Sequence, residues 1–275
     1  MSARKWCRCD ARRGRGVSQG ALAGYGVLVT RPVAQSGELA DAIEGAGGQA
    51  IRFPVMDIDG AAAADVAKAF AELPQPDIIV FVSRNAVIYG LAAINTADAL
   101  IAVIGPATKA AVEENGIQVD IVPEQGSDSE QLLAHPDLQD VEGKTITIVR
   151  GEHGREKLAE TLRSRGATIN YLPVYQRHLH SASAGELATL DKSWHDGEVD
   201  CVTVMSVETL HNLLQLIPSA CRELLVETPL VAPSARVIQT AEESIPGIST
   251  VLAPGPQTAD IISALIKLRQ SGQSK

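Results

Sequence analysis

Four hydroxyl residues of this chain follow short β-type runs at points where helical sequence begins. They are Ser83, Thr108, Ser206 and Ser234. Backbone N–H groups at the start of a helix are unpaired, and the helix dipole makes this end attractive to anions. Ligands of open parallel sheets bind outside the carboxyl ends of the strands, so these turns are candidate anion-binding sites. Each residue could instead be a plain N-cap or early-turn residue, and one side chain can serve in both roles.

Basic residues stand at the same kind of strand end. They are Arg31, Arg84, Lys109 and Arg150. A guanidinium can hold a carboxylate through two parallel hydrogen bonds, so the arginines are candidates for binding an acidic ligand. A solvated surface position is the alternative for each of them. His178 and His180 have the spacing of a metal pair, but no third ligand is in view, and exposure to solvent is the favoured interpretation.

The elements that must position these residues alternate between β-rich runs and helical stretches, which indicates βαβ units and mainly parallel sheets. The predicted strands are 27–30, 49–53, 78–82, 101–104, 119–121, 145–149, 168–172, 201–205, 229–231 and 249–252. Gly47, Gly116 and Gly166 mark predicted helix ends, where the backbone needs a left-handed residue.

Two parts of the chain repeat one another. The run Gly26–Arg31 resembles Gly143–Arg150, and Asp77–Ser83 resembles Asp200–Ser206. The repeat is longer than the roughly 20 to 50 residues of a solenoid unit, so it indicates a duplicated α/β half. We therefore expect two similar lobes with a cleft between them, which is a preferred place for a small-molecule site.

Two matched extended stretches, Arg52–Ile58 and Tyr171–Arg177, each contain a proline and lie where each half passes from its first βαβ portion to its second. The chain is therefore expected to cross between the lobes twice. The predicted division is a disordered tail at 1–25, a discontinuous lobe 1 at 26–52 plus 178–268, a lobe 2 at 58–172, and linker strands at 53–57 and 173–177.

The composition argues against several classes of protein. A length of 275 residues suits two domains. The net charge of −9, the pI of about 5.2 and an aromatic content of 3% argue against nucleic-acid binding. No apolar run approaches the roughly 20 residues of a membrane span, and the basic N-terminal segment lacks the apolar core of a secretory signal. The four cysteines have no disulfide or zinc spacing, so a reducing cytoplasm is the expected setting.

Several short motifs occur in an order that resembles the uroporphyrinogen-III synthase family over about residues 26–268. They are Leu28–Pro32, Phe81–Val87, Ile104–Thr108, Leu172–Gln176, Met205–Ser206 and Pro233–Ser234. The resemblance implies two flavodoxin-like α/β lobes with parallel sheets, joined by a two-stranded linker. It implies a hydro-lyase of tetrapyrrole biosynthesis that closes linear hydroxymethylbilane to uroporphyrinogen III, with loss of water and inversion of ring D. It also implies a monomer that needs no cofactor.

The resemblance implies roles for individual residues as well. Tyr175 matches the family's proposed catalytic tyrosine, and a phenol with a pKa near 10 can protonate the hydroxyl that leaves the substrate. Packing of the Tyr175 ring between the lobes is the alternative. The substrate is an octacarboxylate, and the residues predicted to bind it are Thr30, Arg31, Ser83, Arg84, Asn85, Gly105, Thr108, Arg150, Ser206 and Ser234.

Two other functions compete with this one. A two-lobed α/β protein could bind a small molecule without catalysis, and it would leave only the product of spontaneous ring closure. A nucleotide or flavin enzyme is disfavoured, because the chain contains no Gly-x-Gly-x-x-Gly motif and no P-loop lysine.

Overall fold

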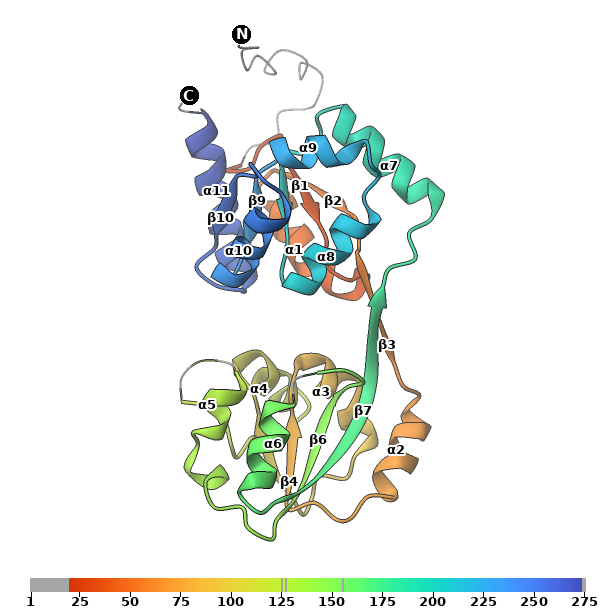
Figure 1. Cartoon of the computed structure of the whole chain (residues 1–275), viewed down its shortest axis with the longest axis vertical. Helices are drawn as coiled ribbons and strands as arrows, with labels where there is room; N and C mark the ends of the chain where they lie inside the picture. The colour runs from red at the N-terminus through yellow and green to blue at the C-terminus, as the bar shows by residue number, and fades with distance from the viewer. Residues whose placement is uncertain (1–19, 125, 127, 155, 274–275) are drawn as a thin grey trace. The chain divides into compact units, whose positions relative to one another are not determined.

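The computed structural model describes residues 20–273 apart from residues 125, 127 and 155. The chain divides into two compact units. Unit 1 joins the chain up to Asp57 to the chain from Leu179 onward, and unit 2 is the continuous segment Ile58–His178. The strands form two five-stranded sheets, which are drawn in Figure 1. The predicted α/β class with two mainly parallel sheets is confirmed.

The sheet of unit 1 has the strand order β10-β9-β8-β1-β2, and every neighbouring pair is parallel. Its strands are β1 (Gly26–Val29), β2 (Gln49–Arg52), β8 (Cys201–Thr203), β9 (Leu230–Ala232) and β10 (Thr250–Leu252). Its helices are α1 (Val33–Gly45), α7 (Ala184–His195), α8 (Val207–Leu216), α9 (Cys221–Glu227), α10 (Ala235–Ser244) and α11 (Thr258–Gln273).

Helices cover both faces of this sheet. Successive residues of β1 point to opposite faces, so Val27 and Val29 belong to one apolar core and Leu28 to the other. Helices α1 and α11 pack on the side of Val27, whereas α7, α8, α9 and α10 pack on the side of Leu28. All four residues of β1 are buried, as expected for a parallel strand between two helical layers.

The second sheet has the strand order β3-β7-β6-β4-β5. Its strands are β3 (Met56–Gly60), β4 (Ile78–Phe81), β5 (Leu100–Val103), β6 (Thr145–Gly151) and β7 (Thr168–Leu179). Strands β5, β4, β6 and β7 are parallel to one another. The helices of unit 2 are α2 (Ala63–Ala71), α3 (Arg84–Gly90), α4 (Pro106–Glu113), α5 (Ser129–Leu133) and α6 (Lys157–Ser164), with short 3-10 turns at Leu91–Ala93 and Pro136–Leu138.

This sheet also has an apolar core on each face. Ile79 and Phe81 of β4 face the core formed with α2, α3 and α4, whereas Ile78 and Val80 face the core formed with α5 and α6. The first of these cores also contains Tyr175. The layer formed by α2, α3 and α4 therefore covers the face of the sheet on which the predicted catalytic side chain lies.

The boundary between the units crosses β3 after Asp57 and β7 after His178. The His180 N–H donates to the Val55 carbonyl at 3.2 Å, and the Ala61 N–H donates to the Val174 carbonyl at 2.9 Å. These pairs show that β3 and β7 run in opposite directions. Residues 53–55 of the predicted linker precede β3, and residues 173–177 lie within β7.

Three predictions about local structure need correction. The predicted tail extends too far, because Leu22 is fully buried in the core of unit 1, while residues 1–19, with Cys7 and Cys9, lie outside the described residues. The predicted strand 119–121 forms only an isolated bridge between Ile121 and Ala102. No helix was predicted over residues 221–227, where the structure has α9. The N-cap position of this helix is Ala220, whose side chain cannot make the capping hydrogen bond by which a helix start is recognised in a sequence.

None of the helices among residues 20–273, the three gaps excepted, is long and apolar enough to cross a membrane.

Candidate active site

The carboxyl ends of parallel strands meet at one edge of a sheet, here called the carboxyl edge. The structure brings all of the predicted catalytic and substrate-binding residues to this edge in one unit or the other. Unit 2 places Ser83, Arg84, Asn85, Gly105, Thr108, Arg150 and Tyr175 there, and unit 1 places Thr30, Arg31, Ser206 and Ser234 there.

Tyr175 and Ser83 are in direct contact in unit 2. The Tyr175 hydroxyl lies 3.1 Å from the Oγ of Ser83. The Tyr175 side chain is largely buried, with the residue only 8% exposed, and its ring centroid lies 6.1 Å from that of Tyr89 in a tilted arrangement. The ring therefore packs within unit 2, and the hydroxyl is held at the position where β4 ends and α3 begins.

Three of the predicted serines are helix N-caps. Ser83 accepts a hydrogen bond from the Ala86 N–H at 3.1 Å, Ser206 from Thr209 at 3.1 Å and Ser234 from Val237 at 3.4 Å. Each cap uses an oxygen lone pair and leaves the hydroxyl proton for another partner. In Ser206 the hydroxyl also lies 2.8 Å from that of Thr209. The N-cap interpretation is thus confirmed for these serines, and anion binding at the same turns stays a prediction.

The start of α4 supplies the corresponding turn after β5. Gly105 is the N-cap residue of this helix, and its carbonyl accepts a hydrogen bond from the Thr108 N–H at 3.1 Å. Thr108 is buried, whereas Lys109 is half-exposed and its ammonium nitrogen lies 3.7 Å from a Glu113 carboxylate oxygen. Arg84 occupies the first position of α3, and its side chain is exposed to solvent.

Arg31 occupies an unusual position at the carboxyl edge of unit 1. Its Nη2 lies 3.5 Å from the Met205 sulfur and 3.4 Å from the Pro256 carbonyl, and its buried Nε has no hydrogen-bond partner among the residues that the structure describes. Burial lowers the pKa of Arg31, while the charge of Glu38 acts in the opposite sense. A half-buried guanidinium with an unused donor is suited to an anionic ligand.

Its neighbour Thr30 has a different role. The Thr30 side chain is fully buried, and its hydroxyl donates to the Thr203 carbonyl at 2.7 Å. The Thr203 hydroxyl in turn donates to the Leu28 carbonyl at 3.0 Å. These reciprocal bonds join β1 to β8, so Thr30 supports the sheet and its hydroxyl is not presented to a ligand.

Arg150 was predicted to bind a ligand carboxylate, but it already has a carboxylate partner in the chain. Its Nη1 lies 2.8 Å from the Glu156 Oε1, and its guanidinium carbon lies 4.7 Å from the centroid of the Tyr171 ring. The Tyr171 hydroxyl donates to the other oxygen of Glu156. Hydrogen bonds from Tyr171 and from Arg150 hold the pKa of Glu156 below its usual value. Within unit 2 the charge of Arg150 is neutralised by Glu156, and binding of a ligand carboxylate by Arg150 stays a prediction.

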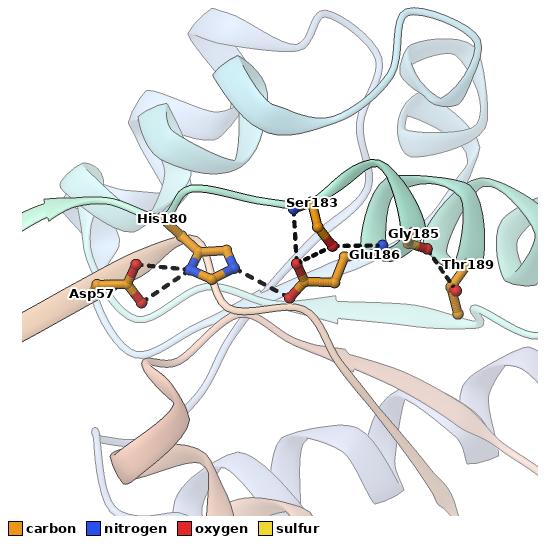
Figure 2. A network of polar contacts seen from close by, with 6 residues as sticks. All are labelled: Asp57, His180, Ser183, Gly185, Glu186 and Thr189. Atoms are coloured by element: carbon orange, nitrogen blue, oxygen red, sulfur yellow. Dashed lines mark hydrogen bonds and ion pairs between the residues drawn. The ribbon is translucent and has the colours of Figure 1, made fainter.

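The two histidines also differ from one another. His178 is 44% exposed, as predicted, and lies 3.7 Å from Asp59. The prediction is wrong for His180, whose side chain is only 14% exposed. Figure 2 shows its ring between two carboxylates, with Nδ1 2.8 Å from an Asp57 oxygen and Nε2 3.3 Å from Glu186 Oε1. Among the described residues no group of three or more His, Cys, Asp or Glu side chains could hold a metal ion.

The His180 network joins β3 to the start of α7 within unit 1. Glu186 also accepts hydrogen bonds from the Ser183 hydroxyl and backbone N–H in a capping box, and these bonds, with that of His180, lower the pKa of Glu186 to about 2. Burial alone would lower the pKa of His180, but hydrogen bonds to Asp57 and Glu186 outweigh it and raise the pKa above 6.5. The imidazolium form therefore ties the two carboxylates together.

A pH dependence of stability follows from the raised pKa. His180 contributes stability that is fully present below about pH 6.5 and is lost as the pH rises through its higher folded-state pKa. We expect His180→Gln to lower the free energy of unfolding by about 1 kcal/mol at about pH 6 and by clearly less at about pH 8.5. Urea denaturation at both pH values measures this difference. His178→Gln is the exposed control, and a His180→Gln deficit that is constant or grows with pH contradicts the assignment.

Comparison with known proteins decides the family. A family model described as Uroporphyrinogen-III synthase HemD matches residues 37–263. The chain is 32% identical over 226 residues to the uroporphyrinogen-III synthase of Escherichia coli strain K12, covering 79% of this chain and 90% of that protein. The chain belongs to the uroporphyrinogen-III synthase family. The family predicted from the sequence motifs is confirmed, and the protein is an enzyme of the hydro-lyase class.

Other relatives of the uroporphyrinogen-III synthase family agree with this assignment. A putative uroporphyrinogen-III synthase of Methanothermobacter thermautotrophicus is 31% identical over 248 residues, covering 87% of this chain and 96% of that protein. A crystal structure of a mutant uroporphyrinogen III synthase from Thermus thermophilus has a TM-score of 0.61 at 18% identity, over 91% of this chain and 100% of that chain. The enzyme from Helicobacter pylori 26695 has a TM-score of 0.59 at 12% identity, over 90% of this chain and 99% of that chain. These two structures share the fold. Membership of the family does not favour the non-catalytic binding protein.

Proposed function

We propose that this enzyme closes hydroxymethylbilane to uroporphyrinogen III, with Tyr175 as the acid that releases the leaving hydroxyl. Family membership supports the reaction. The observation that supports the role of Tyr175 is its hydroxyl, held 3.1 Å from the Ser83 Oγ at the carboxyl edge of unit 2. The reaction loses water without a change in oxidation state, so the proposal requires no redox cofactor.

The hydrogen bonds around Ser83 determine how Tyr175 can act. The Ser83 oxygen accepts the Ala86 N–H, so its single proton is free to be donated to the Tyr175 oxygen. In this arrangement the Tyr175 proton is available for the substrate hydroxyl. The same Ser83 bond strengthens as negative charge develops on the phenol oxygen during proton transfer. Ser83 therefore lowers the cost of using a phenol as an acid at neutral pH.

The substrate carboxylates need donors that do not depend on net charge, because the chain carries a net charge of −9. The first-turn N–H groups of helices α3, α4, α8 and α10 provide such donors, and the Arg31 guanidinium provides a charged one. Each of these helices begins at the carboxyl edge of its unit. We propose that these groups bind the acidic side chains of the bilane.

Two conservative changes test the anion-binding turns of unit 2. We expect Ser83→Ala and Thr108→Val each to lower kcat/KM by about tenfold. Ser83 loses its hydrogen bond to the Tyr175 oxygen, which becomes charged in the reaction, and Thr108 loses one to a substrate carboxylate, and such a bond contributes about 1.5 kcal/mol or more. Steady-state kinetics with folding checked by circular dichroism measures this loss. Thr147→Val is the matched control, since Thr147 is a buried threonine of β6 whose hydroxyl has no partner within the described part of the chain. Parent-like kinetics in both site variants would show that the two hydroxyls only support the local fold.

One assay tests the reaction itself. The protein is incubated with enzymatically generated hydroxymethylbilane, the products are oxidised, and the porphyrin isomers are separated. An active enzyme yields the type III isomer, because the last ring is inverted before closure. A product composed only of the type I isomer, which spontaneous closure forms, would overturn the proposed reaction and leave a binding protein.

We also propose that the enzyme is a monomer, acts in the cytoplasm on a small-molecule substrate, and binds neither nucleic acid nor a membrane. Size-exclusion chromatography with light scattering tests the oligomeric state.

A further inference from the structure

The pairing of β6 with β7 changes register beside Tyr175. The two strands pair regularly from Thr145 with Thr168 to Arg150 with Pro173, but the next pair is Gly151 with Tyr175. Val174 is thus an extra residue on β7, which is a β-bulge. Pro173 has no N–H and cannot donate a hydrogen bond to β6. The register therefore shifts at a place where β7 already lacks one hydrogen bond between the strands.

The bulge changes the direction of the Tyr175 side chain. In a regular strand successive side chains point to opposite faces. Here Val174 and Tyr175 are consecutive and both belong to the core between the sheet and α2, α3 and α4. The extra residue therefore brings the Tyr175 ring to the face on which α3 begins with Ser83.

Gly151 leaves the space that this ring occupies. A Cβ atom on Gly151 would lie 2.9 Å from two carbons of the Tyr175 ring and 3.2 Å from its hydroxyl oxygen. Contacts of carbon with carbon are normally about 3.5 to 4.0 Å, so a side chain at Gly151 would displace the ring. Glycine is needed at this position because the Tyr175 ring leaves no room for a side chain.

The chain around Gly151 is held from both sides. The Arg150 Nε donates to the Gly151 carbonyl at 3.2 Å, and Arg150 is itself fixed by Glu156. The Glu152 N–H donates to the Tyr175 carbonyl at 2.8 Å. Gly151 therefore has little freedom to move away from a displaced ring, and the displacement must be taken up by Tyr175.

We propose that Gly151 is a positioning residue, which together with the β7 bulge sets the Tyr175 hydroxyl at Ser83. Gly151 acts through Tyr175 and itself needs no contact with the substrate. This inference rests on the proposed role of Tyr175 as the acid. A shift of about 1 Å in a reacting group can lower a rate by about a hundredfold, so a methyl group at this position has a measurable effect.

The test is a double-mutant cycle on kcat. We expect Gly151→Ala to lower kcat by about ten- to a hundredfold with KM changed less than about twofold. In the Tyr175→Phe background the same substitution has almost no further effect on kcat, because no hydroxyl remains to be misplaced. Gly48→Ala is the matched control, since its Cβ would lie 2.9 Å from an Ile43 methyl in a core of unit 1. We expect it to lower the melting temperature and leave kcat unchanged.

The outcomes separate a failure of the positioning role of Gly151 from a failure of the proposed role of Tyr175. Parent-like kcat in Tyr175→Phe would overturn the role of Tyr175, whatever Gly151→Ala does. A slow Tyr175→Phe with a parent-like Gly151→Ala would overturn the positioning role alone, as would a Gly151→Ala effect of equal size in both backgrounds. Should Gly151→Ala not fold, Glu156→Gln is the second variant, because it removes the carboxylate charge that fixes the buried Arg150 beside Gly151. It is expected to lower kcat at least threefold only when Tyr175 is present, and parent-like kcat would overturn the inference.

Discussion

Replacing Tyr175 with phenylalanine is expected to lower the rate of type III product formation by at least about a hundredfold. The substitution keeps the ring that packs beside Tyr89 and removes only the hydroxyl that contacts Ser83. General-acid assistance is worth about a hundred- to ten-thousandfold, and spontaneous closure then competes with the slowed enzyme. The measurement is the initial rate together with the ratio of type III to type I isomers, which shifts toward type I.

Tyr89→Phe is the matched control for this experiment. The Tyr89 ring lies in the same core, and its hydroxyl donates to the Ile58 carbonyl at 3.4 Å, away from Ser83. We expect a parent-like rate and isomer ratio for Tyr89→Phe. If Tyr175→Phe retained more than half of the parent rate with an unchanged isomer ratio, Tyr175 would be a packing residue, and the acid would be another group or a carboxylate of the substrate itself.

The second large effect is expected at Arg31. We expect Arg31→Gln to raise KM by up to about a hundredfold, since a guanidinium holds a carboxylate with bonds about twice as strong as neutral ones. The melting temperature is expected to change little, because the Nη2 contacts that are lost, to the Met205 sulfur and the Pro256 carbonyl, are long at 3.5 and 3.4 Å, and the Nε has no partner in the described chain. Steady-state kinetics and thermal denaturation on the same samples separate ligand binding from folding.

Two further variants define what Arg31 contributes. Arg31→Lys keeps the charge but loses the planar fork, so its KM should lie between those of the parent and Arg31→Gln. Lys267→Gln removes one positive charge at an exposed position of α11 and corrects for the change in net charge. An unchanged KM in Arg31→Gln, with a lower melting temperature, would assign Arg31 to the packing of unit 1.

Much of the fold could be predicted because it depends on local patterns. The short apolar runs that became β1, β4 and β8 are buried on both faces, and such runs are recognisable without knowledge of their partners. The N-caps Ser83, Ser206 and Ser234 follow from a hydroxyl residue between a strand and a helix. Left-handed backbone at Gly116 and Gly166 follows from the position of glycine at a helix end.

What the sequence did not reveal depends on which side chains meet across the fold. Arg150 and Arg31 occupy corresponding positions in the repeat, yet Arg150 has a direct carboxylate partner in Glu156, whereas the contacts of the Arg31 Nη2 are with the Met205 sulfur and the Pro256 carbonyl. His180 is enclosed because Asp57, distant in sequence, lies on the strand beside it. The bulge at Val174 could not be predicted either, since a register shift depends on both strands.

The discontinuity of unit 1 has a consequence for the order of folding during synthesis. Unit 2 is one continuous segment, whereas β1 must pair with β8, which leaves the ribosome only after all of unit 2. Because domains fold as units while the chain grows, we expect unit 2 to fold first, with β1 still lacking β8. An apolar strand with a free edge is prone to pair with other chains. A nascent chain that stops before Cys201 would therefore carry a folded unit 2 and a β1 that can pair with β2 but has its β8 edge free, and we expect the need for chaperones to be greatest at this stage.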